Sequence, residues 1–282
     1  MNTIFFDKPA NWQTTQRLMQ QSWEHRKAEF QGRAAHDTFF SYVITPASGR
    51  WAFFSSGKTG TTTVLDALFE VEFGCVCNTV IEDPTDLNKD AALHRTVQAG
   101  VFRQLHLRND VESLGGYLDR CLRIASVRHP TDRAWSSFRY LCRSARLRHG
   151  QFSMDRLRMN ALVGMDWEHH AMNREGFERF LDYIRISLEA GGEMEVNNHW
   201  RPQVLDVRPD LFAPHILARL EDPGSWRREL AERLDNPAPL SERHRNPGED
   251  KTEQLPEWFG QNSIRSRLEA VYGCDYEAFG YR

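Results

Sequence analysis

The sequence predicts an α/β fold in which helices flank a mainly parallel central sheet. Three observations indicate it. Apolar segments alternate with segments of helical periodicity along the 282 residues, as in chains built from strand–helix–strand units. The chain is 40% hydrophobic, which is enough to bury a sizeable core. A glycine-containing turn joins a strand to a helix near residue 58. We expect one domain over residues 1–282, with a helical lead-in over 1–35 and a helical insert over 150–190.

The first half of the chain predicts a hairpin followed by helices and strands. Aromatic and β-branched residues on both sides of the turn at 46–49 predict strands over 38–45 and 50–56. Val64, Leu65 and Leu68 lie at helical spacing and predict a helix over 61–73. The other elements expected in this half are a strand over 75–81, a helix over 88–97 and a strand over 100–107.

The second half predicts one clear strand and several helices. Residues 121–130 are apolar and end at Pro130, which indicates a strand, and a long helix is expected over 131–148. Residues 191–210 form a long loop in this prediction. The remaining expected elements are helices over 153–163, 174–189, 224–234 and 262–272 and a strand over 215–222.

Composition and charge exclude several classes of protein. The longest apolar run is too short to span a bilayer, and the first residues lack a signal-peptide pattern, so we expect no transmembrane segment. Five cysteines, an odd number in a long chain, do not indicate a disulfide framework, so we expect a cytoplasmic protein. A net charge of −3 argues against a nucleic-acid partner.

Residues 55–63, Ser-Ser-Gly-Lys-Thr-Gly-Thr-Thr-Thr, have the pattern of an anion-binding loop. Gly57 and Gly60 allow sharp turns, and the N–H groups at the start of the following helix attract an anion. Lys58 adds a positive charge, and the threonines add hydroxyl donors. The alternative is an ordinary strand–turn–helix in which a threonine caps the helix.

Two kinds of anion site fit this loop. A nucleoside-triphosphate loop has the pattern Gly-x-x-x-x-Gly-Lys-Ser/Thr. Here Gly57-Lys58-Thr59 would supply its end, but Ala52 occupies the first glycine position. The next clear strand ends at Arg128, not at an aspartate that could hold Mg²⁺. A nucleotide-dependent kinase is therefore the alternative interpretation.

Residues 58–62 resemble the 5′-phosphosulfate loop of sulfotransferases that use 3′-phosphoadenylyl sulfate (PAPS). A second segment resembles the 3′-phosphate-binding segment of the same family: Arg128 ends a strand, Pro130 begins a helix, and Ser136 follows Arg128 by eight residues. From these residues alone, Arg128 could also be a buried arginine paired with an acid.

Two further segments resemble the carbohydrate branch of that family. Residues 198–203 resemble its His-Trp-x-Pro loop, and residues 272–281 resemble its C-terminal segment. The resemblance covers about residues 50–282 and implies a P-loop-like α/β fold. It also implies PAPS as donor, 3′,5′-ADP (PAP) as product, no metal, and a hydroxyl on a sugar or small glycan as acceptor. A soluble bacterial member is expected, because the membrane anchor of the Golgi members is not seen.

The resemblance assigns roles to particular residues. Lys58 would stabilise the leaving oxygen, and His106, at the end of the strand over 100–107, would be the base that takes the acceptor proton. His199 is the other candidate for the base, and it could instead bind the acceptor together with Trp200. The residues expected to hold the donor are Lys58, Thr59, Gly60, Thr61, Thr62, Arg128 and Ser136, with Arg243 and Arg245 from a loop that closes over it.

Arginines on the helix after Arg128 indicate an acceptor with negative charge. Arg139, Arg143 and Arg146 share the side of this helix that carries Ser136, so they would extend outward from the donor site. We expect Arg139 and Arg143 to contact the acceptor. The alternatives are a solvated charged face and, for the whole chain, a nucleotide-binding protein without catalytic activity.

Overall fold

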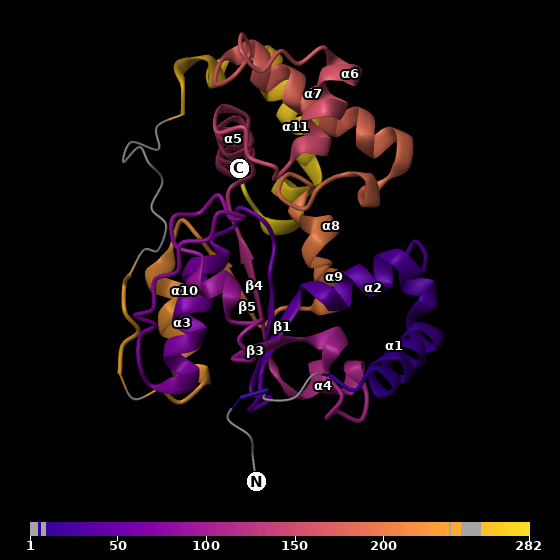
Figure 1. Ribbon diagram of the computed structural model, residues 1–282, viewed down its shortest axis with the longest axis vertical. Coiled ribbons are helices and arrows are strands. Elements are labelled where there is room, and N and C mark those ends of the chain that lie inside the picture. Colours follow the sequence, from indigo (N-terminus) through magenta and orange to yellow (C-terminus); the bar gives the residue numbers. More distant parts are fainter. Residues whose placement is uncertain (1–4, 7–9, 237, 244–254) are drawn as a thin grey trace.

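The computed structural model describes residues 5–6, 10–236, 238–243 and 255–282, and within these residues a five-stranded sheet organises the chain (Figure 1). Its order is β3-β1-β2-β4-β5, and its strands are β1 (Val43–Pro46), β2 (Trp51–Phe54), β3 (Phe102–Gln104), β4 (Leu122–Val127) and β5 (Ile216–Arg219). Strands β2, β4 and β5 are parallel, whereas β1 is antiparallel to both of its neighbours. Because β1 is antiparallel to both β2 and β3, strands β2, β3, β4 and β5 all run in one direction. The described sheet is therefore mainly parallel, as expected, and the hairpin strand β1 runs against the others.

Helices cover both faces of the sheet, and a helical layer lies above it (Figure 1). Helices α3 (Thr61–Phe73) and α10 (Pro223–Arg233) pack on the face that carries Phe53 and Ile124. The opposite face carries Ala52 and Phe54, and it is covered by α1 (Trp12–Arg26), α2 (Arg33–Tyr42), α4 (Leu114–Arg120), α8 (Gln203–Val207) and α9 (Pro209–Phe212). The helical layer consists of α5 (Pro130–Arg146), α6 (Ser153–Val163), α7 (Arg174–Gly191) and α11 (Asn262–Phe279), with a core of its own.

The hairpin is confirmed, but its first strand is shorter than expected. Val43 pairs with Phe54 and Ile44 with Phe53, whereas residues 38–42 form the end of α2. Ala35 and Phe39 are spaced four residues apart and are buried, which is the pattern of a helix face. Phe40 is equally buried, so a short aromatic run fits a buried helix as well as a strand.

The expectations for residues 75–107 are largely wrong. Residues 75–81 form no strand, and the helix over 88–97 is a single 3₁₀ turn, Ala92–Arg95. The strand over 100–107 is limited to β3 and is followed by the 3₁₀ turn η3 (Leu105–Leu107). Side-chain contacts to α3 and α5, not local periodicity, hold this segment. The loop over 191–210 contains the short helix α8 and the 3₁₀ turn η4 (Glu193–Glu195).

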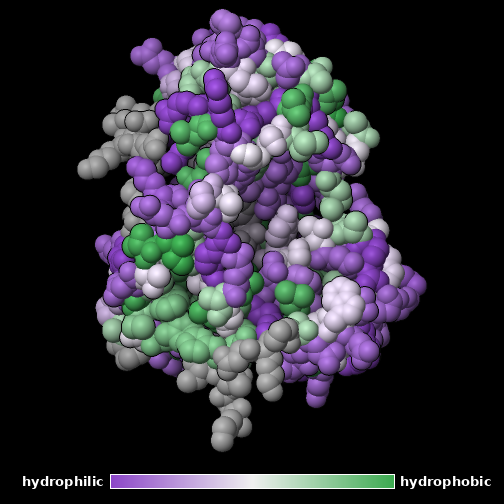
Figure 2. Space-filling view, viewed as in Figure 1, coloured by the Kyte–Doolittle hydropathy of each residue, from purple (hydrophilic) through white to green (hydrophobic). Residues whose placement is uncertain are grey.

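The other expected helices and strands are confirmed. Helices α3, α5, α6, α7 and α10 and strands β4 and β5 lie within one to three residues of their predicted bounds, while α11 runs seven residues further, to Phe279. No helix in the described parts of the chain combines the length and the apolar character that crossing a bilayer requires. Hydrophilic residues dominate the face in Figure 2, which is hollowed where the helical layer meets the sheet layer.

Candidate functional site

The loop between β2 and α3 is shaped as an anion cradle. Lys58 and Gly60 adopt left-handed backbone conformations, with φ of 63° and 82°. The hydroxyls of Thr59 and Thr61 both donate to the carbonyl oxygen of Ser56, at 3.0 Å and 2.7 Å, and fold the loop back on itself. A non-glycine residue in this conformation is strained and is typical of a functional site. The open N–H groups of the first turn of α3 complete an anion site.

The side chain of Thr59 has a structural role. Its side chain is buried, and its hydroxyl lies 2.6 Å from the hydroxyl of Ser126 on β4. The hydroxyl is therefore used inside the protein, and Thr59 can offer a ligand only its backbone N–H. The contact joins the loop to the strand that leads to Arg128.

Gly57 lies against the backbone of a distant segment. A Cβ atom at this position would lie 2.7 Å from the Cα of His199 and 2.9 Å from the carbonyl oxygen of Asn198. Both contacts are with backbone, which cannot move aside as a side chain can. Only glycine permits this approach of the loop to residues 198–199.

We expect Gly57→Ala to lower the free energy of unfolding by about 1–3 kcal/mol, because the added methyl group forces the two segments apart. Urea denaturation followed by tryptophan fluorescence measures it. Gly115→Ala is the matched control, since a Cβ there meets no atom within 4 Å. Equal midpoints for the two variants would contradict the close approach.

A buried arginine joins the same two segments. The guanidinium of Arg133 donates to three carbonyl oxygens: Nε to Gly57 at 2.9 Å, Nη1 to Arg201 at 2.6 Å and Nη2 to Asn198 at 2.8 Å. The Asp206 carboxylate lies 3.8 Å from it and also accepts from the Ser56 hydroxyl at 3.0 Å. Arg133 thus fixes the anion cradle against residues 198–201.

Four cations gather at the mouth of the loop. The Nζ of Lys58 lies 3.8 Å from the centroid of the Tyr140 ring on α5. Burial, followed by the charges of Arg128, Arg143 and Arg139, lowers the pKa of Lys58 to about 7. We call Lys58, Arg128, Arg139 and Arg143 the cation cluster. Mutual repulsion of this kind is relieved when an anion binds, so the cluster is suited to a multiply charged anion.

The backbone of Arg128 is held by two of the segments singled out in the sequence. Its N–H donates to Oε1 of Gln203 at 2.8 Å, and its carbonyl oxygen accepts from Nε2 of Gln203 at 2.9 Å. The Asp275 carboxylate accepts from the backbone N–H of Gln203 and of Val204, both at 2.8 Å. Residues 198–203 and 272–281 therefore position the end of β4. Ser136 is half-buried on α5, the helix that follows.

His199 is held as a neutral imidazole beside the cation cluster. Its Nδ1 lies 2.9 Å from Oδ1 of Asn197, whose Nδ2 donates to Asp155 at 3.2 Å. Because this amide oxygen can only accept, Nδ1 carries the proton and Nε2 does not. Burial, followed by the charges of Lys58 and Arg133, lowers the pKa of His199 to about 3. Its ring stacks on Tyr140, with centroids 6.0 Å apart.

A model of the sulfotransferase family matches residues 53–282, a range that contains the cradle, the cation cluster and both segments that hold Arg128. The chain belongs to the sulfotransferase family. The comparisons with curated proteins and with solved structures give no match. The family identification therefore depends on this one match and agrees with the resemblance of the two anion-binding segments.

In this sulfotransferase-family chain, Trp200 is a core residue. Its side chain is fully buried, and its ring lies 5.3 Å from Phe152 and 5.9 Å from Phe180. A buried indole cannot contact an acceptor, so the expectation that Trp200 binds substrate is replaced by a packing role. The aromatic contacts anchor the segment that carries His199.

Asp86 and His94 were not expected at the site. Nδ1 of His94 lies 2.7 Å from the Asp86 carboxylate. Burial acts to raise the pKa of Asp86, but hydrogen bonds with His94 and Asn88 lower it to about 2. The Asp86 charge acts on both Lys58 and His199. Asn88 extends the contact to the Tyr140 hydroxyl at 3.3 Å, so this irregular segment forms one wall of the cation cluster.

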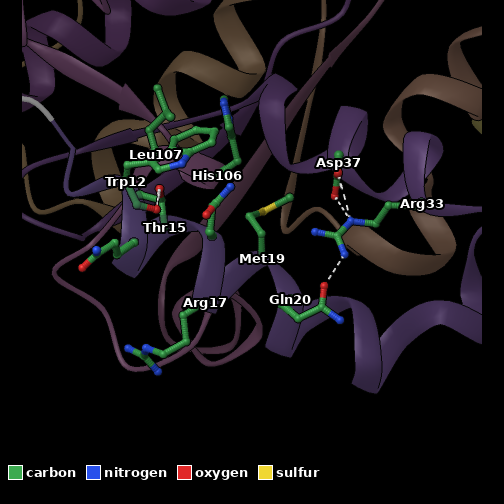
Figure 3. Close-up of a pocket in the computed structure, with 11 residues that line it drawn as sticks. Trp12, Thr15, Arg17, Met19, Gln20, Arg33, Asp37, His106 and Leu107 are labelled. Carbon is green, nitrogen blue, oxygen red and sulfur yellow. Dashed lines mark hydrogen bonds and ion pairs between the residues drawn. The ribbon is translucent and has the colours of Figure 1, made fainter.

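His106 lies at the same edge of the sheet as the cradle but among different residues. Its ring forms a hydrogen bond with the backbone of Phe40, and Asp37 is the charge that acts on it. Burial lowers the pKa of His106. Its side chain lines a cavity between α1 and α2 (Figure 3). Strand β1 separates β3 from β2, so the carboxyl ends of these strands are about 10 Å apart.

The expected closing loop is described only in part. Nη1 of Arg243 donates to the carbonyl oxygen of Cys77 at 3.3 Å and to Oδ1 of Asn78 at 3.2 Å. Arg243 therefore lies against the irregular segment that follows α3. Arg245 lies outside the described residues.

Proposed function

We propose that this chain transfers a sulfuryl group from PAPS to a hydroxyl of a carbohydrate acceptor and releases 3′,5′-ADP, without a metal. The cation cluster at the cradle is the observation that carries the proposal. Family membership supports sulfuryl transfer in general. A nucleotide-dependent kinase has no comparable support, because Ala52 replaces the first glycine of the triphosphate loop and β4 leads to Arg128, not to an aspartate.

The residues present fit the donor. The cradle over residues 58–62 and the positive end of the α3 dipole would hold the 5′-phosphosulfate. Arg128 and Ser136 would hold the 3′-phosphate from the start of α5. Arg243, placed against residues 77–78, would approach the nucleotide from outside. The P-loop-like character of the fold is part of this proposal.

Bound PAPS supplies an electrophilic sulfur and a phosphate leaving group. Lys58 supplies positive charge where negative charge develops on the leaving oxygen. We assign the acceptor proton to His106, because its side chain lines an open cavity at the edge of the sheet that also carries the cradle. His199, with a pKa of about 3, is a weak base, and we assign it the role of a neutral wall beside Lys58.

Calorimetry of nucleotide binding tests the proposal. We expect metal-free binding of 3′,5′-ADP to the wild type and a loss of about 10–100-fold in affinity for Arg128→Ala, which removes a charge-assisted contact. Arg185→Ala, on the far side of α7 and paired with Glu189, is the matched control and should bind as the wild type does. Release of 3′,5′-ADP from PAPS that depends on an acceptor would then separate an enzyme from a non-catalytic nucleotide-binding protein.

Binding of Mg-ATP in preference to 3′,5′-ADP would overturn the proposal in favour of a kinase. Binding of neither nucleotide would overturn both. The cytoplasmic location expected from the sequence stays a prediction.

A further inference from the structure

A cavity lies between α1, α2 and the turn η3. Its volume is about 620 Å³, within the range of sites for small molecules and short oligosaccharides. Figure 3 shows its lining, in which Arg33 lies between Asp37 and Gln20. The cavity is open to solvent, and His106 and Leu107 of η3 line it together with α1 and α2, so a ligand can enter and reach the His106 side chain.

This cavity is built mainly from residues outside the family match. Helices α1 and α2 precede residue 53, where the match begins, and only His106 and Leu107 of the lining come from within it. Most of the cavity therefore lies outside the part of the chain that matches the family. Such a region is suited to selecting a ligand, because loops and extensions around a fixed site commonly set specificity.

The lining has the chemistry of a sugar site. The indole of Trp12 is 67% exposed and offers a flat apolar face on which the C–H groups of a sugar ring can stack. Gln13 and Gln16 provide amide donors and acceptors for hydroxyl groups, whereas the amide of Gln20 is held by Glu24 and Arg33. These groups lie on one helix, α1, at spacings that place Trp12, Gln16 and Gln20 on one side of it.

Arg33 and Asp37 of α2 form a second wall, and Arg33 links this wall to Gln20 of α1. Nε of Arg33 donates to both oxygens of Asp37, at 2.8 Å and 2.9 Å, and Nη1 donates to Oε1 of Gln20 at 2.7 Å. These three planar groups present a rigid set of donors and acceptors, which lowers the entropic cost of binding a ligand with many hydroxyls.

Helix α2 connects the cavity to the anion cradle. Helix α2 ends at Tyr42, whose carbonyl oxygen accepts from the N–H of Ser55 at 3.0 Å, at the start of the cradle. Asp37 is five residues back along α2, about 7.5 Å along the helix axis. A ligand in the cavity would therefore lie among α1, α2 and η3, and His106 is the lining residue that lies at the same edge of the sheet as the cradle.

We propose that this cavity is the acceptor subsite and that it takes a saccharide, with Trp12 as the stacking platform and the Arg33–Asp37–Gln20 wall binding hydroxyl groups. The proposal rests on the proposed function. It gives the segment before residue 53 the role of selecting the acceptor, with His106 at the inner end of the cavity.

The test is binding of the full chain to an array of immobilised neutral and uronic-acid-containing oligosaccharides, with 3′,5′-ADP present. We expect Trp12→Ala to bind about tenfold more weakly than the wild type and Trp12→Phe to retain part of the binding. Arg33→Met should also bind more weakly. Arg26→Met is the control and should bind as the wild type does, because Arg26 pairs with Glu29 away from the cavity. Trp12 is exposed, so its replacement should leave the fold intact.

Saccharide binding that is the same in Trp12→Ala and in the wild type would overturn the proposal, as would the lack of binding to every saccharide of both classes. Calorimetry of 3′,5′-ADP with the same proteins keeps this result separate from the proposed function. A wild type and a Trp12→Ala variant that bind the nucleotide equally but no saccharide would remove the subsite and leave the donor site standing.

Discussion

Lys58→Met should weaken the binding of 3′,5′-ADP by about 10–100-fold at pH 6, because it removes a charge-assisted contact from the centre of the cation cluster. The difference should shrink as the pH rises above 7. The free protein holds Lys58 with a pKa of about 7, so the lysine is charged below this pH and increasingly neutral above it. An anion favours the charged form, so binding above pH 7 requires the uptake of a proton.

The measurement is calorimetry between pH 5.5 and 9, in buffers of different ionisation enthalpy that reveal proton uptake. The phosphates of the ligand ionise near pH 6, but this contribution is common to both proteins and cancels in their ratio. Lys27→Met is the matched control, because Lys27 is exposed and pairs with Glu24 far from the cradle. A ratio of affinities that stays constant across this range would show that Lys58 does not titrate beside the ligand.

The same variant should lower kcat for sulfuryl transfer by about 10²–10³-fold, the usual cost of removing one group that stabilises developing charge. At saturating PAPS and acceptor the loss of binding no longer contributes, so kcat reports the leaving-oxygen role alone. An unchanged kcat would show that Lys58 contributes to donor binding but not to stabilising the leaving oxygen.

Local sequence predicts those parts of the site whose geometry is itself local. The cradle over residues 55–63 could be predicted, because glycines and threonines at fixed offsets between a strand and a helix specify a turn and open N–H groups. The position of Arg128 followed in the same way from an apolar run that ends at Pro130. In both cases the residues that set the geometry are within a few positions of the residues to which we assign anion binding.

The remaining parts depend on contacts between distant segments. Asp86 and His94 lie in a stretch without regular structure, and only tertiary contacts bring them to Lys58. Trp200 has the composition of a substrate contact, but the helices α6 and α7 bury it. Residues 38–42 have the pattern of a strand but form the end of α2, because Phe39 and Phe40 fit both kinds of buried element. The local pattern of apolar residues does not predict which distant segment will pack over a given residue.

The contacts of Arg133 also join distant segments, so local sequence does not predict them. In the sequence, Arg133 is a second arginine between Arg128 and Ser136, and no role follows from this position. In the structure it is 1% exposed and is the donor for carbonyl oxygens on two segments, Gly57 on one and Asn198 and Arg201 on the other. An arginine fork can serve three acceptors in a plane, whereas a lysine ammonium at the same place is a single point of charge.

We therefore expect Arg133→Ala to lower the free energy of unfolding by about 3–5 kcal/mol, because three carbonyl oxygens lose their donor and the buried Asp206 loses one of its two nearby arginines while keeping Arg201 at 3.3 Å. Arg133→Lys should recover only part of this loss. Urea denaturation measures both variants, and Arg185→Ala, which breaks an exposed pair with Glu189, should change the free energy by less than about 0.5 kcal/mol.

If Arg133→Ala does not fold, Arg133→Lys still distinguishes two roles of Arg133. One is a specific clamp that holds the cradle against residues 198–201, and the other is a contribution to the stability of the whole protein. A clamp between the cradle and residues 198–201 holds Lys58 and His199 in register, so its loosening should weaken 3′,5′-ADP binding even where the protein is fully folded. Calorimetry at 10 °C, in conditions where circular dichroism shows a native spectrum, makes that comparison. A folded Arg133→Lys variant that binds 3′,5′-ADP as tightly as the wild type would show that the cradle holds its shape without the fork. The loop conformation at Lys58 would then be set within the loop, by Gly60 and by the hydrogen bonds of Thr59 and Thr61 to Ser56.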